Sequence, residues 1–280
     1  MTWVERNLDH IEKLRAYISG FQNTRPSLFN WFQGGREPLF PYTPESDRGT
    51  ALLLCFCALY QKISEEKLIR VLGVLWQDYD VDLFRLGKLP YADLQNKIFQ
   101  IPELNEWGLR SKAPGILRST SDFFFTHGRL VPWVQKLADG EEAVRVLCEE
   151  VFMMGKTSAF KSKPRYFLYL LTQLPGVNPA LFWTKHTLLT ITPGHLRFIR
   201  EFGPLKNRKR SPWVTAEEKL SYGNRFFSML SPTEPWAVYA ALDAYLKPKD
   251  KEKILWQCRD TLGGCLQCSL AALCPGREVE

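Results

Sequence analysis

The sequence predicts an all-α fold, and three observations support this prediction. Apolar residues recur every three or four positions in the first segment and so share one helix face: Val4, Leu8, Ile11, Leu14 and Ile18. Residues that commonly cap helices precede several apolar segments. No segment alternates polar and apolar residues between hairpin turns, as a strand with one solvated face would. We therefore expect roughly ten or more helices and at most incidental strands.

The longest unbroken apolar run is ALLLCFCALY, at residues 51–60. It is about half as long as a membrane-spanning helix, so it predicts a helix buried in the protein core. Ser64, followed by Glu65 and Glu66, then supplies a cap and two carboxylates at the start of the next helix.

Helices are also predicted towards the C-terminus. Thr215 and Glu218 have the spacing of a capping box. Pro235 lies near the first turn of a further helix, whose apolar side comprises Val238, Ala241, Leu242 and Tyr245. The main breaks are the Pro- and Gly-rich segment 25–44 and the basic loop 203–213. Neither resembles a long tether, so we expect two lobes that pack together.

The composition is typical of a globular protein, with 280 residues, of which 45% are hydrophobic and 24% charged. The N-terminal residues MTWVERNLDHIEKL lack the basic start and the apolar stretch of a secretory signal. With no membrane-spanning run either, we expect a cytoplasmic protein and no membrane partner. The net charge of +7 favours a polyanionic partner such as nucleic acid.

One motif is rejected. Residues 155–157, Gly-Lys-Thr, resemble the end of a phosphate-binding loop. The first glycine of that motif would lie five residues earlier, where the chain has Glu150, and no strand is predicted before it. Because a carboxylate there would repel phosphate, we do not expect a nucleotide-binding loop.

Four of the seven cysteines lie within a short C-terminal segment, at Cys258, Cys265, Cys268 and Cys274. In a reducing compartment such a cluster indicates metal ligands rather than disulfides. The intervals of six, two and five residues lack the two close pairs and long spacer that are typical of a four-cysteine zinc site. They suit a 4Fe-4S cluster better, with zinc as the alternative. The other three, Cys55, Cys57 and Cys148, have apolar neighbours and are expected in the core.

This cysteine spacing resembles endonuclease III and the adenine glycosylases, the iron-sulfur branch of the helix-hairpin-helix (HhH-GPD) DNA glycosylases. Residues 108–117, GLRSKAPGIL, are similar to a helix start of that family, and residues 128–132, GRLVP, to its "GEVP". Leu174, Pro175, Gly176 and Val177 repeat the start of its hairpin signature "LPGVG", with Asn178 at the second glycine. Asparagine tolerates a left-handed backbone, so the turn can form.

The resemblance implies a two-lobe fold. Residues 46–192 would form a six-helix barrel with the hairpin, and residues 1–45 and 193–280 a helical lobe with the 4Fe-4S cluster. A monomer would bind double-stranded DNA in the groove between the lobes and turn the target base out of the stack. In a bacterium such a protein would be associated with the nucleoid. Backbone N–H groups of the hairpin would contact a phosphate.

Both catalytic positions of the family are altered. The lysine that forms a Schiff base in the bifunctional members corresponds to Ala180, and the aspartate of the family's "VDTH" to Pro193, although His195 aligns. Lys185 and Glu201 are weak substitutes. We therefore expect an active enzyme to lack lyase activity.

Several residues are expected to contact DNA. Two basic groups form the electrostatic footprint: Lys206, Arg208, Lys209 and Arg210 in one, and Lys156, Lys161, Lys163 and Arg165 in the other. Gln61 resembles the glutamine that fills the gap left by a flipped base.

Three functions remain open on this basis. The chain is a monofunctional base-excision DNA glycosylase, a catalytically inactive relative that binds distorted or damaged DNA, or an electron carrier. An electron carrier has no use for the hairpin, so this third function ranks last.

Overall fold

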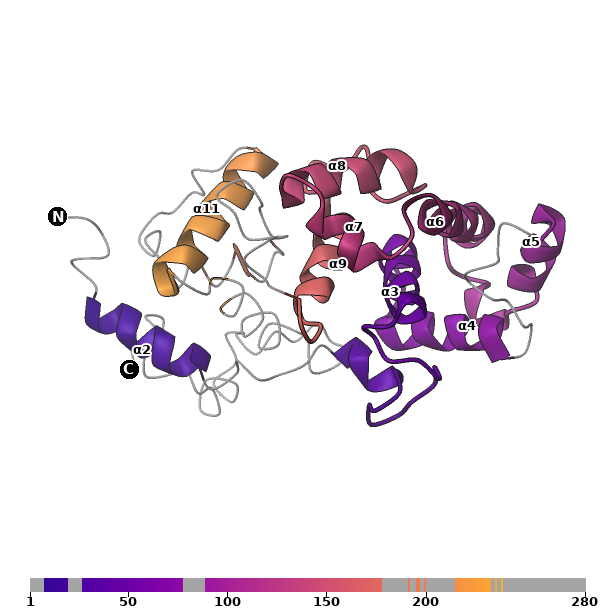
Figure 1. Cartoon of the computed structure of the whole chain (residues 1–280), viewed down its shortest axis with the longest axis horizontal. Coiled ribbons are helices and arrows are strands. Elements are labelled where there is room, and N and C mark those ends of the chain that lie inside the picture. The colour runs from indigo at the N-terminus through magenta and orange to yellow at the C-terminus, as the bar shows by residue number, and fades with distance from the viewer. Residues whose placement is uncertain are drawn as a thin grey trace, which may run out of the picture. The chain divides into compact units, whose positions relative to one another are not determined.

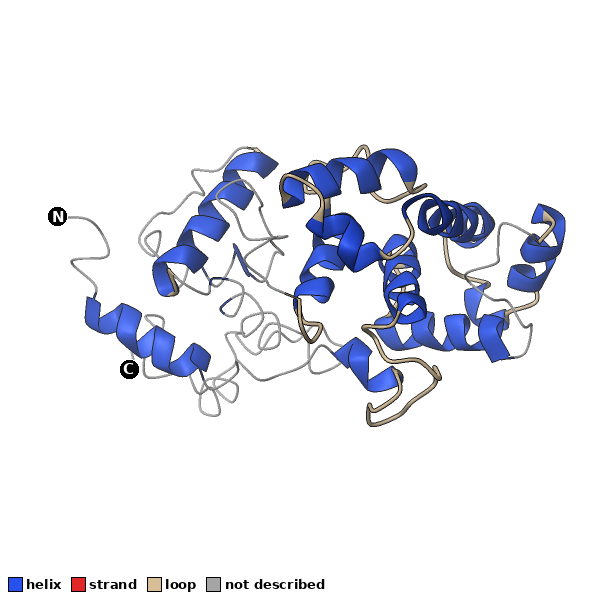
Figure 2. Ribbon diagram, viewed as in Figure 1, coloured by secondary structure: helices blue, strands red, loops and turns tan. Residues whose placement is uncertain are grey.

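The computed structural model describes residues 8–19, 27–77, 89–177 and 215–232, together with residues 191, 195–196, 199, 235 and 238. These residues form helices and connecting loops and contain no strand (Figure 2), which confirms the predicted all-α class for this part of the chain. The chain divides into two compact units. Unit 1 comprises Met1–Thr24 and Leu189–Glu280, and unit 2 comprises Arg25–Leu188.

Unit 2 begins earlier than the boundary expected at residue 46. The Pro- and Gly-rich segment that looked like a break contains the 3-10 helix η1 (Ser27–Trp31) and packs against the rest of the unit. Phe32 is fully buried, and the rings of Tyr42 and Trp76 meet in a T-shaped arrangement with their centroids 5.2 Å apart. Buried aromatic side chains therefore anchor a segment whose composition suggested a linker.

Seven helices are described in unit 2, joined in part by the 3-10 turns η3 (Pro102–Leu104) and η4 (Arg110–Lys112). They are α3 (Asp47–Leu59), α4 (Glu65–Gln77), α5 (Tyr91–Phe99), α6 (Ala113–His127), α7 (Leu130–Gln135), α8 (Gly140–Glu150) and α9 (Ser162–Thr172). Helix α3 is central and contacts α4, α6, α7 and α9 (Figure 1). All of its residues from Gly49 to Leu59 are buried, as the apolar run predicted. Because its neighbours surround it, α3 needs no polar face.

The helix start predicted at Ser64 is present, and a further cap occurs at Ser46. The Ser46 side chain accepts a hydrogen bond from Gly49 N and caps α3, and Ser64 Oγ accepts one from Lys67 N at 3.2 Å at the start of α4. Helix α6 follows η4 directly, at the segment that resembles the family's helix start, and ends at Gly128 with a positive φ of 70°. The three cysteines expected in the core, Cys55, Cys57 and Cys148, are buried.

In unit 1 the described helices are α2 (Leu8–Ser19) and α11 (Ala216–Leu230). Thr215 and Glu218 form the predicted capping box at the start of α11. At the other end, the Arg15 guanidinium of α2 donates to the backbone oxygens of Met229 and Leu230, two carbonyls without donors inside the helix. Gly223 of α11 lies against Ile191, whose Cδ1 would be 2.6 Å from an added Cβ, so a larger residue there would require the Ile191 side chain to shift.

None of the described helices is long and apolar enough to cross a membrane.

Candidate functional site

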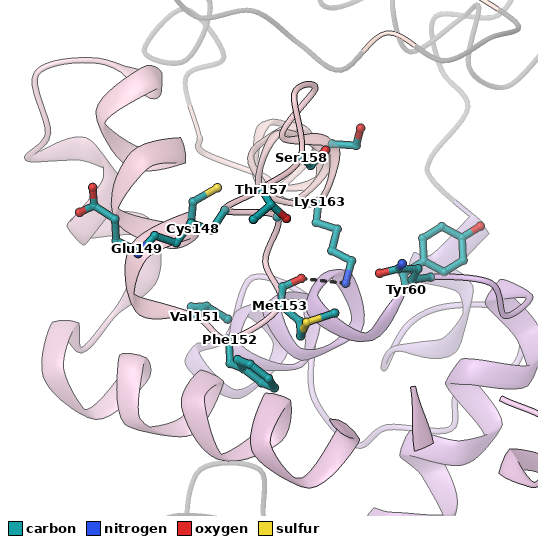
Figure 3. Close-up of a pocket in the computed structure, with 13 residues that line it drawn as sticks. Tyr60, Cys148, Glu149, Val151, Phe152, Met153, Thr157, Ser158 and Lys163 are labelled. Carbon is teal, nitrogen blue, oxygen red and sulfur yellow. Dashed lines mark hydrogen bonds between the residues drawn. The ribbon is translucent and has the colours of Figure 1, made fainter. Parts of the chain in front are cut away.

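Unit 2 contains a pocket of about 580 Å³ between the end of α3 and the connection from α8 to α9 (Figure 3). One wall consists of Tyr60 and Gln61, which follow α3. The opposite wall is formed by the end of α8, by the connecting loop between residues 151 and 158, and by the first residues of α9. Its volume lies within the range of about 300 to 1,000 Å³ that is usual for small-molecule sites.

Lys163, the second residue of α9, extends into this pocket towards Met153, with Thr157 and Ser158 on one side and Tyr60 on the other (Figure 3). Its Nζ donates to two backbone oxygens, that of Ala58 at 2.5 Å and that of Met153 at 2.9 Å. Ala58 lies in the last turn of α3, where carbonyls have no donor within the helix and the helix dipole favours a cation. Lys163 thus joins three segments around the pocket.

Burial lowers the pKa of Lys163 from its ordinary 10.5 to about 8. Burial also raises the pKa of Cys57 well above the ordinary value of a thiol. Cys57 is therefore a neutral thiol near pH 7 and supplies no counter-charge. The result is a pocket amine of which a substantial fraction is unprotonated under physiological conditions.

The backbone around the pocket is strained. Lys62, Met153 and Lys161 have positive φ values of 56°, 62° and 46°, and in the part of the chain that the structure describes no other non-glycine residue has one. Met153 lines the pocket, Lys62 directly follows Gln61, and Lys161 directly precedes Ser162 at the start of α9. A left-handed residue with a side chain costs about 1 to 2 kcal/mol, and such strain concentrates at functional sites.

Side chains hold the strained loop in place. The Lys161 ammonium donates to the backbone oxygens of Gly155 and Lys156, and Arg165 Nε donates to Phe160 O at 3.2 Å. The Arg165 guanidinium also makes two hydrogen bonds to the carboxylate of Glu141, at 2.5 and 2.8 Å. Only 6% of the Arg165 side chain is exposed. The prediction that Arg165 belongs to a DNA-facing basic surface is therefore wrong, because Glu141 neutralises it inside the unit.

Lys156 and Lys163, both predicted to contact DNA, line the pocket, and so does Gln61. Gln61 is exposed, and its backbone oxygen accepts a hydrogen bond from the Trp107 indole at 2.9 Å. The preceding Tyr60 stacks on Phe56 at 5.0 Å between ring centroids. Both contacts fix the backbone from which the Gln61 side chain projects.

The predicted hairpin signature forms a turn after α9. Leu174 is buried, Pro175 and Gly176 are exposed, Val177 N donates to Leu174 O at 3.3 Å, and Gly176 has a positive φ of 76°. Asn178 and the helix expected after it lie outside the described residues. The role of this turn as a DNA-binding hairpin stays a prediction.

The remaining predicted residues also lie outside the described part of the chain. These are the ligands Cys258, Cys265, Cys268 and Cys274, the basic residues Lys206, Arg208, Lys209 and Arg210, and the positions Ala180, Lys185, Pro193 and Glu201. Among the residues that are described, no group of three or more His, Cys, Asp or Glu side chains is placed to hold a metal ion. The cluster therefore stays a prediction from the sequence.

His195, which aligns with the histidine of the family's "VDTH", is fully buried in unit 1. Its ring meets Phe227 at 5.6 Å between centroids, in an edge-on arrangement. Burial lowers its pKa from 6.5 to about 3. It is thus a neutral core histidine at physiological pH.

The Gly-Lys-Thr segment at residues 155–157 is not a phosphate-binding loop of the strand-to-helix type, because helix α8 precedes it. Glu150, expected to repel phosphate, instead pairs with His127 Nε2 at 2.7 Å. The three residues Gly155, Lys156 and Thr157 do line the pocket. The sequence places Lys163 among the basic residues expected to contact DNA, and its position in this pocket follows only from the packing of α3 against α9.

Comparison with known protein families, with curated proteins and with solved structures gives no match for this chain.

Proposed function

We propose that this protein is a DNA-binding iron-sulfur protein of the endonuclease III-like helix-hairpin-helix type, which excises a damaged base held in the unit 2 pocket. The observation that carries the proposal is the meeting of Gln61 and Lys163 at that pocket. A residue expected to fill the gap of a flipped base thus lies at the same cavity as a partly buried amine.

The surroundings of the pocket support a role in recognition. All three left-handed non-glycine residues among those described lie in or beside it, and backbone strain of this kind persists where function requires it. Unstacking a base costs a few kcal/mol, which contacts from side chains such as Gln61 would offset. The pocket volume of about 580 Å³ is within the range usual for small-molecule sites.

The cluster completes the proposal. Cys258, Cys265, Cys268 and Cys274 would hold the four irons of a 4Fe-4S cluster as thiolates. Purified under nitrogen, the protein should absorb broadly near 400 nm and contain about four irons per chain. Changing Cys268 to alanine should remove both signals, whereas one zinc and no colour would contradict the cluster.

The function is tested with duplexes that each contain one lesion, followed by alkaline strand scission. We expect at least one lesion to be converted to an abasic site. Gln61→Ala should lower the amount of this abasic product. If about six phosphates are contacted, log K should fall with log salt at a slope of about −5. Absence of an abasic product from every lesion would rule out the enzyme.

A second candidate is a catalytically inactive relative that binds distorted or damaged duplex. It is favoured by the state of the acidic group at the pocket. In the described part of the lining the only carboxylate is Glu149, and an ion pair with Arg145 at 2.9 Å already engages it. Tight binding to lesion-bearing DNA without any excision would select this function. Absence of DNA binding would contradict both candidates.

A further inference from the structure

We propose that the unit 2 pocket binds the phosphate monoester of a nucleotide, with the Lys163 ammonium and the hydroxyls of Thr157 and Ser158 as donors to the phosphate oxygens. The resemblance assigns a phosphate contact to the turn at residues 174–177, so this second phosphate site comes from the pocket and not from the motif. That the nucleotide belongs to a DNA strand rests on the proposed function.

Lys163 supplies a cation that is held in place and has a further donor for a ligand. An ammonium has three N–H bonds and no acceptor. The backbone oxygens of Ala58 and Met153 accept two of them, at 2.5 and 2.9 Å. Carbonyls carry no net charge, so these contacts position the nitrogen and leave its charge uncompensated. The third N–H can therefore donate to an anion in the pocket.

The charged side chains of the lining favour a phosphate monoester. Lys156 lines the pocket together with Lys163, and the single carboxylate in the described lining, Glu149, is already paired with Arg145 at 2.9 Å. A phosphate monoester carries a charge of about −1.5 to −2 at pH 7, whereas each internal phosphate of a DNA strand carries about −1. The two lysines therefore match a monoester better than an internal phosphate.

Hydroxyl and N–H donors lie beside the ammonium. Thr157 and Ser158 lie on one side of Lys163 in the pocket (Figure 3), and Ser162, which precedes Lys163 in sequence, also lines it. A hydroxyl donates to a phosphate oxygen and turns about its C–O bond to suit it. Ser162 and Lys163 also begin α9, where backbone N–H groups lack acceptors within the helix and the helix dipole favours an anion. One wall of the pocket thus offers three kinds of donor.

Aromatic rings favour a nucleotide as the carrier of the phosphate. Tyr60 and Phe152 line the same pocket and are 38% and 48% exposed. Exposed aromatic rings are surfaces on which nucleic acid bases stack. The pocket therefore combines phosphate donors with rings that suit a base.

The phosphate can be the 5′ end of a DNA strand or part of a free nucleotide, so the test has two arms with the full-length protein. The first compares a gapped duplex that has a 5′-phosphate at the gap with one that has a 5′-hydroxyl. The second compares free deoxyadenosine 5′-monophosphate with deoxyadenosine. In the DNA arm we expect the phosphate to tighten binding at least about tenfold. The bound phosphate should also slow the reductive methylation of Lys163 by formaldehyde, which mass spectrometry locates.

Variants separate phosphate binding from folding. Lys156→Met removes a charge but none of the bonds of Lys163, and should lower the preference for phosphate about threefold. Lys163→Met should abolish the preference, but it also removes the bonds to Ala58 and Met153. Lys163→Arg keeps a cation with several N–H donors and should restore most of the preference. Lys136→Met, on an exposed residue after α7 and outside the pocket lining, is the matched control and should leave the preference unchanged.

The outcomes distinguish this inference from the proposed function. Binding of the gapped duplex without a preference for the 5′-phosphate would overturn the inference and leave DNA binding intact, and so would a preference that survives in both methionine variants of the pocket. Binding of free deoxyadenosine 5′-monophosphate with protection of Lys163, but without DNA binding, would support the phosphate site and contradict the proposed function. Absence of binding in both arms would contradict both.

Discussion

The ion pair between Glu141 and Arg165 should be a main support of the pocket loop, and replacing Glu141 with alanine tests this. Arg165 has only 6% of its side chain exposed and uses both terminal nitrogens on the Glu141 carboxylate. Removing one partner of a fully buried pair costs about 3 to 5 kcal/mol, because the other charge stays buried. Glu141 is 35% exposed, so water replaces part of the lost contact. We therefore expect Glu141→Ala to lower the free energy of unfolding by about 2 to 3 kcal/mol.

The same helix supplies a matched control. Glu149 pairs with Arg145, four residues earlier, at 2.9 Å. The Glu149 side chain is 50% exposed and the Arg145 side chain 59% exposed. An exposed pair at this spacing contributes only about 0.3 to 0.5 kcal/mol, so Glu149→Ala should change stability little. Urea unfolding followed by tryptophan fluorescence measures both variants. Equal losses of stability in the two variants would refute the reasoning that burial of Arg165 sets the cost.

Three further predictions follow from the described residues. Burial lowers the pKa of Lys163 to about 8, so the rate of its reductive methylation by formaldehyde should rise with pH to a midpoint near 8, well below that of an ordinary lysine. A midpoint near 10.5 in the pH profile of that rate would contradict the burial argument. The folded state holds His195 at a pKa of about 3, below the 6.5 of the unfolded chain, so its contribution to stability is complete above pH 6.5 and is lost towards pH 3. At pH 5 the free energy of unfolding should be lower by about 2 kcal/mol for this reason. The decrease should be absent from His195→Leu when the stabilities of both proteins are measured between pH 7 and 5. Thr215→Ala should lower stability by about 1 kcal/mol because it removes the capping box of α11, whereas Thr215→Ser should retain most of it.

Much of the fold could be predicted from local patterns. Ser64, Thr215 and the apolar run at 51–60 act through neighbours in sequence, and each forms the cap or buried helix that its pattern indicates. The boundary between the units falls at the first residue of the Pro- and Gly-rich segment 25–44. The composition of this segment indicated a break, but buried Phe32 and the contact between Tyr42 and Trp76 attach it to unit 2.

The candidate site shows the same limit. Gln61 is predicted from its resemblance to the glutamine that fills the gap left by a flipped base, and it lines the pocket, although its role there stays a prediction. Lys163 and Arg165 looked alike as members of one basic group, two residues apart. The structure separates them, because Glu141 pairs with Arg165 whereas two backbone oxygens hold Lys163.

The sequence by itself determined the helical class of the described residues, the positions of several caps and the burial of three cysteines, because these depend on spacing and on the polarity of adjacent residues. The tertiary structure alone decided that Lys163 enters the pocket and that burial lowers its pKa. That outcome depends on Ala58, more than a hundred positions away, whose carbonyl meets the Lys163 ammonium only when α3 and α9 pack together.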